Sequence, residues 1–242
     1  MFKLLRIYKI RGGKRLEKID WSPLLISLKT GIVATAISFI LGIIIAGLVM
    51  RANKKVKWIL DGILTLPLVL PPTVAGFILL LIFSLRRPFG IFLLNHLGIK
   101  VVQTWYGCVM AAIVIAFPLM YRNTRAAFEQ VDINLIYAGR TLGLSERKIF
   151  WKIIVPVAGP GIASGTVLTF ARAIGEYGAT TMLAGNILGK TRTISTAIAA
   201  EVSAGNYDIA AFWVIVIIIL SFAIVVSINV LTGHGMKNVK RW

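Results

Sequence analysis

The sequence predicts an all-α integral membrane protein with about five transmembrane helices. It has 242 residues, of which 57% are hydrophobic, and its mean hydropathy is positive, as is typical of membrane chains. Several largely uncharged runs reach about 20 residues, the length at which a helix crosses the hydrocarbon core of a bilayer. We expect one transmembrane domain over residues 22–232, between a basic tail at 1–21 and a second tail at 233–242.

The charge and the cysteine content limit the possible partners. The formal net charge is +18, a value that would suggest nucleic-acid binding in a soluble protein. In a membrane chain, basic residues flank the spans and bind anionic lipid headgroups. We therefore expect contact with membrane lipid and none with nucleic acid. The one cysteine, Cys108, lies in an apolar run and excludes an internal disulfide.

The first predicted span covers about Leu24–Met50. Ser22 is a suitable N-cap, and Pro23 suits the first turn because its missing N–H costs nothing there. Gly42 and Ala46, four residues apart, give this helix a small-residue face for close packing against a neighbour.

The second predicted span, about Trp58–Leu85, contains the run LPLVLPP. Pro67, Pro71 and Pro72 each lack a backbone N–H, so the broken turn must face protein or water. The run predicts a kinked helix. Two interpretations stay open, a structural kink covered by neighbouring helices and a kink beside a translocation path.

The third predicted span runs from about Thr104 to Tyr121, with Pro118 near its exit, and the fourth runs from Pro156 to about Met182. Within the fourth, Arg172 and Glu176 have opposite charges at i,i+4 spacing. Intramembrane charges are costly, so we expect them to face the bundle interior and to neutralise one another. They form either a structural ion pair or a contact with a transported anion.

The fourth span also carries Gly161 and Gly165, which predict close helix packing. The fifth span, about Ile209–Thr232, is the plainest of the five. Asn206 or Asp208 is its expected cap.

Residues 133–156 form a polar island, which reads LIYAGRTLGLSERKIFWKIIVP from position 135. Its mixture of basic and apolar residues is also found in ordinary interfacial helices. The spacing is more specific, because it resembles the loop of ABC-importer permeases with the pattern Glu-Ala-Ala, three residues, Gly, nine residues, Ile-x-Leu-Pro. The matching positions are Tyr137, Ala138, Gly139, Gly143, Ile153 and Pro156.

In that family this segment is a cytoplasmic coupling helix, which docks onto a separate ATPase subunit. The small residues Ala138 and Gly139 suit a close contact with a partner's groove, and Gly143 can adopt backbone angles that other residues avoid. The first triplet departs from the pattern twice: Tyr137 replaces the acidic residue, and Gly139 replaces the second alanine.

The loop charges agree with this orientation. With residues 133–156 inside, the cytoplasmic segments hold thirteen Lys and Arg residues and the outer loops hold five, as the positive-inside rule requires. The N-terminal tail, placed outside by alternation, holds seven and disagrees with the rule. A missed re-entrant segment would resolve the conflict.

Three further runs, LPLVLPP, GEYGAT and GNILGKTRT, resemble the sulfate and molybdate branch of these permeases. For the third run, the resemblance implies an outer loop that contacts a substrate-binding protein or caps the outer mouth; its matching residues are Asn186, Gly189, Lys190 and Thr191. The same stretch satisfies a relaxed P-loop pattern. A P-loop follows a strand, however, and a predicted membrane helix precedes this one, so we expect no nucleotide site.

The resemblance implies the type I ABC importer permease fold and the permease subunit of a molybdate importer in the cytoplasmic (inner) membrane. It also implies a permease homodimer, an extracytoplasmic molybdate-binding protein and ATP-binding cassette subunits that hold ATP and Mg²⁺. This chain is then no enzyme and carries no cofactor or metal, and its sequence shows no catalytic motif. The alternatives are a sulfate or tungstate permease and, in another class, an ion-coupled carrier.

Overall fold

The computed structural model describes the backbone of residues 20–235 and the side chains of residues 20–226, and within these limits the chain is helical without strands. In chain order the elements are α2 (Ser22–Met50), α3 (Lys54–Val69), α4 (Pro72–Phe83), α5 (Pro88–Leu97), α6 (Trp105–Glu129), α7 (Ile133–Thr141), α8 (Glu146–Ile149), the π-helical η1 (Phe150–Ile154), α9 (Val155–Val157), α10 (Gly159–Ile174), α11 (Gly178–Ala184), α12 (Ile194–Ser203) and α13 (Tyr207–Gly235). The predicted all-α class is confirmed. The N-terminal tail lies outside the described residues except for its last two, and so does the C-terminal tail beyond Gly235.

Three of the described helices, α2, α6 and α13, are long and apolar enough to cross a membrane alone. Two further candidates are bent pairs. Helices α3 and α4 meet at 109°, and the segment Glu146–Val157 meets α10 at 70°. The described part of the chain therefore has three candidate spans, and five if each bent pair is one span.

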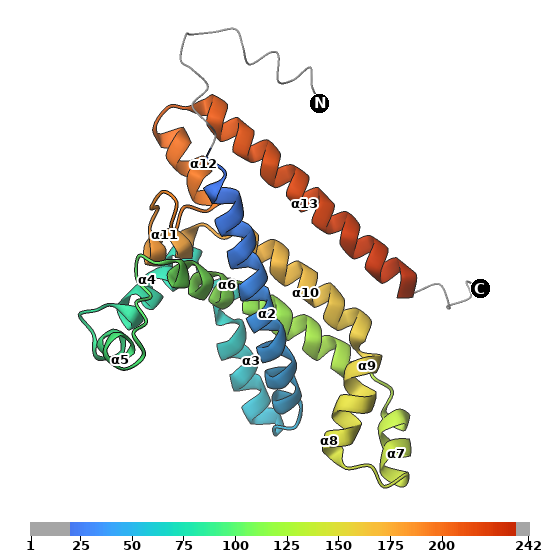
Figure 1. Ribbon diagram of the computed structural model, residues 1–242. Helices are drawn as coiled ribbons and strands as arrows, with labels where there is room; N and C mark the ends of the chain where they lie inside the picture. The colour runs from blue at the N-terminus through green and yellow to red at the C-terminus, as the bar shows by residue number, and fades with distance from the viewer. Residues whose placement is uncertain (1–19, 236–242) are drawn as a thin grey trace.

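Helices α2, α6 and α10 pack together at the centre of the bundle (Figure 1). Small residues bring their backbones close. A Cβ atom at Gly42 would lie 2.7 Å from Met120 Cγ, and one at Gly165 would lie 2.7 Å from Asn123 Cβ. The close packing predicted from these glycines is therefore present.

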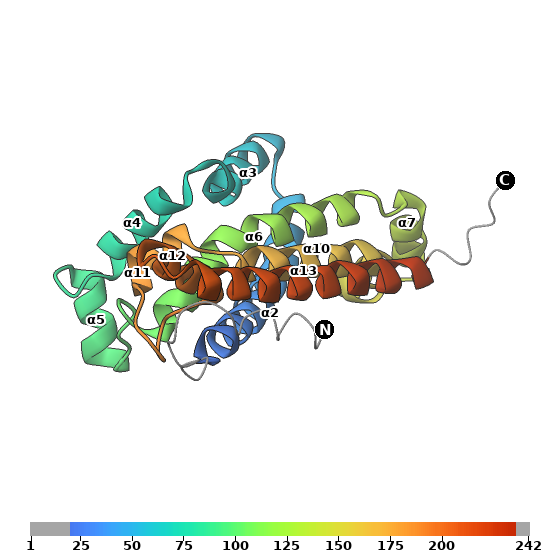
Figure 2. The ribbon, with the colours of Figure 1, turned by 90° about the horizontal axis from the view of Figure 1, so that it is seen from above.

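The connections between helices gather at two ends of the molecule. One end carries the α2–α3 turn and the hairpin of α7 and α8, while α11, α12 and the start of α13 lie at the other (Figure 1). Helices α6, α10 and α13 run along one another, so the C-terminal end of α13 points toward the end that carries α7 (Figure 2). This arrangement gives the alternation that five spans require.

Helix α6 is longer than predicted, because it ends at Glu129 and not at Tyr121. A proline inside a helix removes one hydrogen bond and bends the helix without necessarily ending it, and Pro118 lies within α6. The polar residues Arg125 and Glu129, which look like a loop in the sequence, pair with side chains of α3.

The second and fourth predicted spans are both interrupted: the kink predicted at the prolines is present as a 109° bend, whereas the predicted fourth span to Met182 ends earlier. Pro71 and Pro72 lie at the α3–α4 break, whereas Pro67 lies inside α3. The fourth span stops at Ile174, and α11 begins after the break at residues 175–177. That run is too apolar for hydropathy to reveal the break.

The start of α2 also differs slightly from the prediction. Its N-cap is Trp21, and Ser22 is the first helical residue. The Ser22 hydroxyl and backbone N–H both donate to the Asp20 carboxylate, at 2.6 and 2.9 Å. Both hydrogen bonds lower the pKa of Asp20, and the one from the Ser22 hydroxyl has the larger effect.

Candidate functional site

The first candidate site is the hairpin of residues 133–156 at the end of the bundle, which we call the coupling hairpin after the role predicted for it. The Asp132 carboxylate accepts a hydrogen bond from the Asn134 N–H at 2.9 Å and caps α7. Gly143 closes the turn with φ +74°, and Leu144 N–H donates to the Gly139 carbonyl at 3.0 Å. The left-handed turn expected at Gly143 is therefore present, and it reverses the chain between α7 and α8.

An ion pair joins the two arms of the hairpin. Arg140 Nε donates to Glu146 Oε1 at 2.7 Å, and both side chains are about half exposed. The hydrogen bond to the Glu146 carboxylate raises the pKa of Arg140. Because water screens exposed pairs, this contact orients the hairpin more than it stabilises the fold.

Gly139 has a different position from the one expected. It is buried inside the hairpin, where an added Cβ atom would lie 2.9 Å from Ile153 Cδ1 and 3.2 Å from Ile149 Cγ1. Its small size lets α7 pack against α8 and η1. The expectation that Gly139 faces a partner's groove is therefore wrong, whereas Ala138 is exposed.

The outer surface of the hairpin carries exposed apolar side chains among its charged ones. Ile133, Tyr137 and Leu142 are 51%, 52% and 79% exposed, although they lie on a helix pair that projects from the bundle (Figure 1). Ile153 is partly buried in η1, and Pro156 is exposed in α9. Exposed apolar side chains on a projecting element are typical of a surface that another protein covers.

The second candidate site lies where the two helix breaks meet. A Cβ atom at Gly178, the first residue of α11, would lie 3.0 Å from Pro72 Cβ at the start of α4, and one at Gly76 would lie 2.6 Å from Ala179 Cα. The structure thus brings Pro71 and Pro72 together with the segment that follows Glu176. Pro67 lies farther back, inside α3.

Arg172 and Glu176 form the expected ion pair beside this contact, with Arg172 Nη1 2.9 Å from Glu176 Oε2. The Glu176 side chain is 2% exposed and that of Arg172 is 31% exposed. The prediction places Glu176 inside a continuous helix, but it lies in the break between α10 and α11. Its Oε1 accepts a hydrogen bond from Ala179 N–H at 2.8 Å, so this carboxylate caps α11.

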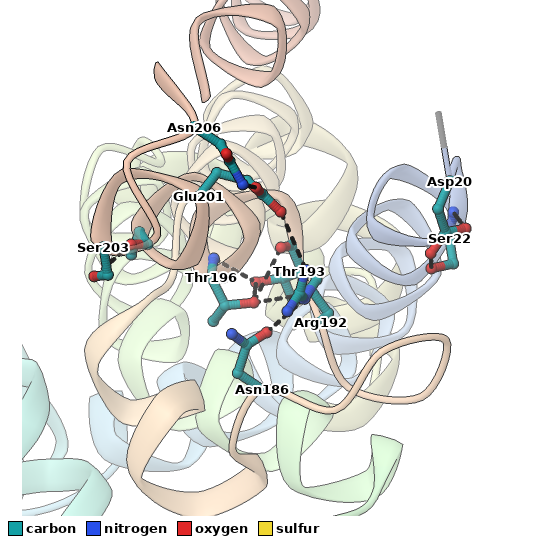
Figure 3. A network of polar contacts seen from close by, with 10 residues as sticks. Asp20, Ser22, Asn186, Arg192, Thr193, Thr196, Glu201, Ser203 and Asn206 are labelled. Carbon is teal, nitrogen blue, oxygen red and sulfur yellow. Dashed lines mark hydrogen bonds and ion pairs between the residues drawn. The ribbon is translucent and has the colours of Figure 1, made fainter. Parts of the chain in front are cut away.

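The third candidate site is the loop between α11 and α12. Thr191 is buried, and its hydroxyl accepts a hydrogen bond from the Ile187 N–H at 3.0 Å. Gly189, with φ +69°, and Lys190 are exposed at the tip. Asn186 Oδ1 accepts from Arg192 Nε at 2.9 Å, and Arg192 Nη1 lies 3.4 Å from Glu201 Oε1 (Figure 3).

These contacts hold the loop on α12, the helix that follows it. A shallow pocket of about 190 Å³ opens between α11 and α12, lined by Tyr177, Thr181, Asn186, Thr196, Ala199, Ala200 and Ser203. The polar groups that line it are neutral. Within the described residues, no three His, Cys, Asp or Glu side chains gather closely enough to hold a metal ion.

The sequence interpretation missed a cluster that joins α3 to α6. Lys57 Nζ lies 2.8 Å from Glu129 Oε1, and the Asp61 carboxylate binds both the Arg125 guanidinium and the Tyr121 hydroxyl. The signal is present in the sequence as two stripes at i,i+4 spacing, Lys57–Asp61 on one helix and Tyr121–Arg125–Glu129 on the other. The second stripe begins where the third span was expected to end.

Comparison with known protein families decides the classification. Residues 38–232 match the family described as the binding-protein-dependent transport system inner membrane component. The chain belongs to this family. The description of the family places the chain in the inner membrane, as predicted.

Curated relatives in this family differ in the substrate that their names state. The chain is 45% identical over 178 residues to the molybdenum transport system permease protein ModB of Escherichia coli (strain K12), with 74% of this chain and 78% of the relative covered. It is 38% identical to the Haemophilus influenzae protein of the same name, over 74% and 78% of the two chains. It is 31% identical to the sulfate transport system permease protein CysT of Salmonella typhimurium, over 88% and 77%.

Solved structures support the fold. The chain matches one from the MetNI methionine ABC transporter with a TM-score of 0.69 and 17% identity, over 88% of this chain and 94% of that one. A second, from a bacterial ABC transporter that imports alginate, matches with a TM-score of 0.69 and 15% identity, over 98% and 83%. The chain therefore has the type I ABC importer permease fold.

Proposed function

We propose that this chain is the membrane-spanning permease subunit of a molybdate importer, which works as a homodimer with two ATP-binding cassette subunits and an extracytoplasmic molybdate-binding protein. The observation that carries the proposal is the coupling hairpin, whose exposed apolar residues Ile133, Tyr137 and Leu142 lie on an element that projects from the bundle. In a family of transport components, this surface fits an ATPase subunit. ATP and Mg²⁺ are held by that subunit, and this chain converts its motion into transport.

The contact between the two helix breaks supports a translocation path beside them. The breaks at Pro71–Pro72 and at Glu176 lie against one another, and irregular backbone at membrane depth is tolerated only beside protein or water. Arg172, which is 31% exposed, is the cation in this region that a passing oxyanion can approach. Movement of α3 and α10 relative to their neighbours would then open the path to one side at a time.

Molybdate is favoured over sulfate because the relatives named for molybdenum are 38–45% identical to this chain, against 31–34% for those named for sulfate. Sulfate is the second candidate for that reason, and tungstate is a third that resembles molybdate in charge and shape. An ion-coupled carrier needs a free carboxylate within the membrane. Glu176 and Asp61 each pair with an arginine instead.

The test is transport by the complete complex in proteoliposomes, with the binding protein loaded in turn with molybdate, tungstate and sulfate. We expect ATP-dependent accumulation of molybdate, and stimulation of ATP hydrolysis by the molybdate-loaded binding protein above that by the sulfate-loaded one. Equal responses to sulfate would contradict the assignment of substrate. Accumulation without ATP, driven by an ion gradient alone, would contradict the transporter class.

A further inference from the structure

The cluster between α3 and α6 is arranged as a ladder of complementary charges. Lys57 on α3 pairs with Glu129 on α6, and one turn farther along, Asp61 pairs with Arg125. Arg125 Nε also donates to Glu129 Oε1 at 3.0 Å, which links the two steps. We call Lys57, Asp61, Tyr121, Arg125 and Glu129 the α3–α6 ladder.

The ladder is partly shielded from water. The side chains of Lys57, Asp61 and Arg125 are 24%, 23% and 20% exposed, so their charges interact more strongly than those of a fully exposed pair. The Tyr121 ring is buried, and its hydroxyl donates to Asp61. Charges removed from water in this way are costly unless they stay paired, so the ladder holds α3 in one register against α6.

The end of helix α6 is joined to the coupling hairpin by a short connection and by an aromatic contact. Only residues 130–132 separate the end of α6 from the start of α7. Phe128, buried near the end of α6, packs edge-on against Phe150 of η1, with ring centroids 5.5 Å apart. A displacement of the hairpin therefore moves this end of α6.

Helix α3 has a thin attachment to the rest of the bundle. None of its 16 residues is buried, and its apolar contact with the neighbouring core is made by the half-buried Leu60 and Leu64. At its far end, α3 leads into the break at Pro71–Pro72, which lies against Gly178. The ladder is thus the strong polar connection between the hairpin side of the molecule and the meeting point of the two breaks.

We propose that the α3–α6 ladder transmits the displacement of the coupling hairpin to the broken pair α3–α4, with Asp61 and Arg125 as positioning residues for transport. This inference rests on the proposed function and adds to it the route by which hydrolysis reaches the path. The ladder keeps α3 moving with α6. Without its charges, α3 slides on the few apolar contacts of Leu60 and Leu64, and the breaks no longer follow the hairpin.

The test measures the ratio of molybdate transported to ATP hydrolysed, in proteoliposomes that contain the complete complex. The variant Asp61→Asn with Arg125→Gln removes both charges of one step together, so no unpaired charge is left to unfold the chain. We expect normal membrane abundance and normal stimulation of ATP hydrolysis by the loaded binding protein. The transport-to-hydrolysis ratio should fall about fivefold or more, the lower end of typical coupling between two sites.

Two further variants serve as controls. Arg122→Gln removes an exposed arginine of the same helix that lies outside the ladder, and it should keep the wild-type ratio. Arg125→Lys keeps the charge at the ladder and should restore most of the ratio, which a loss of packing would not explain. An unchanged ratio in the double variant, or losses of abundance and transport in equal proportion, would overturn the inference. If the wild-type complex itself accumulates no molybdate, the proposed function fails, and the inference fails with it.

Discussion

At the residue scale, Gly143 and Gly139 have different roles in the coupling hairpin. A glycine separated from Ile153 by nine residues predicts the left-handed turn, which Gly143 makes with φ +74°. The same motif suggests that Gly139 faces a partner, yet Gly139 is buried against Ile149 and Ile153. The difference depends on how α7 closes against η1, and local spacing contains no information on that tertiary contact.

The internal position of Gly139 can be tested on this chain alone. We expect Gly139→Phe to open the hairpin, because the ring must displace Ile149, which is fully buried. Tryptic cleavage at the exposed residues Arg140, Arg147 and Lys148 should accelerate about tenfold, since overpacking costs about 1–3 kcal/mol. Gly139→Ala brings a Cβ atom to 2.9 Å from Ile153 Cδ1 and 3.2 Å from Ile149 Cγ1, which small side-chain shifts can relieve, so its cleavage rate should lie between those of the wild type and Gly139→Phe. Ala138→Phe, at an exposed position, is the matched control, and accelerated cleavage there would contradict this account.

At the scale of the elements, prolines mark breaks that hydropathy cannot reveal. Pro71 and Pro72 locate the α3–α4 break in the sequence, but the 109° angle depends on the packing of α4 against α11. The break before α11 has no proline. It depends on the Glu176 carboxylate, which caps the new helix through Ala179 N–H, a role that the i,i+4 spacing to Arg172 conceals.

The contact between α4 and α11 predicts different effects for two glycines of the same broken pair. In Gly76→Val, the added Cβ atom would lie 2.6 Å from Ala179 Cα. This substitution should lower the free energy of unfolding by about 1–3 kcal/mol. Gly62→Val meets nothing within 4 Å and should be nearly neutral. The measurement is the thermal unfolding midpoint of each purified variant in detergent. Equal midpoints would contradict the packing described here.

At the scale of the whole molecule, the order of the spans follows from the sequence because each apolar run must cross the bilayer. The fold class and the inner-membrane location need only this pattern and the family spacing of the hairpin. The sequence does not show that charges on two distant segments, such as Asp61 and Arg125, face each other across α3 and α6. That pairing requires the register between two helices, which the apolar pattern leaves open.

The orientation of the molecule is testable by labelling single cysteines from each side of the membrane. Cys108 is buried, and its Sγ lies 3.5 Å from the Thr191 carbonyl, so Cys108→Ser keeps a donor and gives a cysteine-free background. We expect cysteines at Asn53 and Ser145 to react only from the cytoplasmic side and one at Lys190 only from the outside. All three positions are exposed. Reaction of the Lys190 position from inside would refute the five-span alternation.

The central claim is that the coupling hairpin docks onto an ATPase subunit, and co-purification of that subunit tests it most directly. Gly143 and Gly98 have φ of +74° and +65°, and a Cβ atom at either would meet nothing within 4 Å. Aspartate is equally strained at both positions, but only Gly143→Asp adds a charge to the hairpin. We predict that Gly143→Asp reaches the membrane at wild-type abundance without retaining the ATPase, whereas Gly98→Asp retains it. Full retention of the ATPase by Gly143→Asp would contradict the claim.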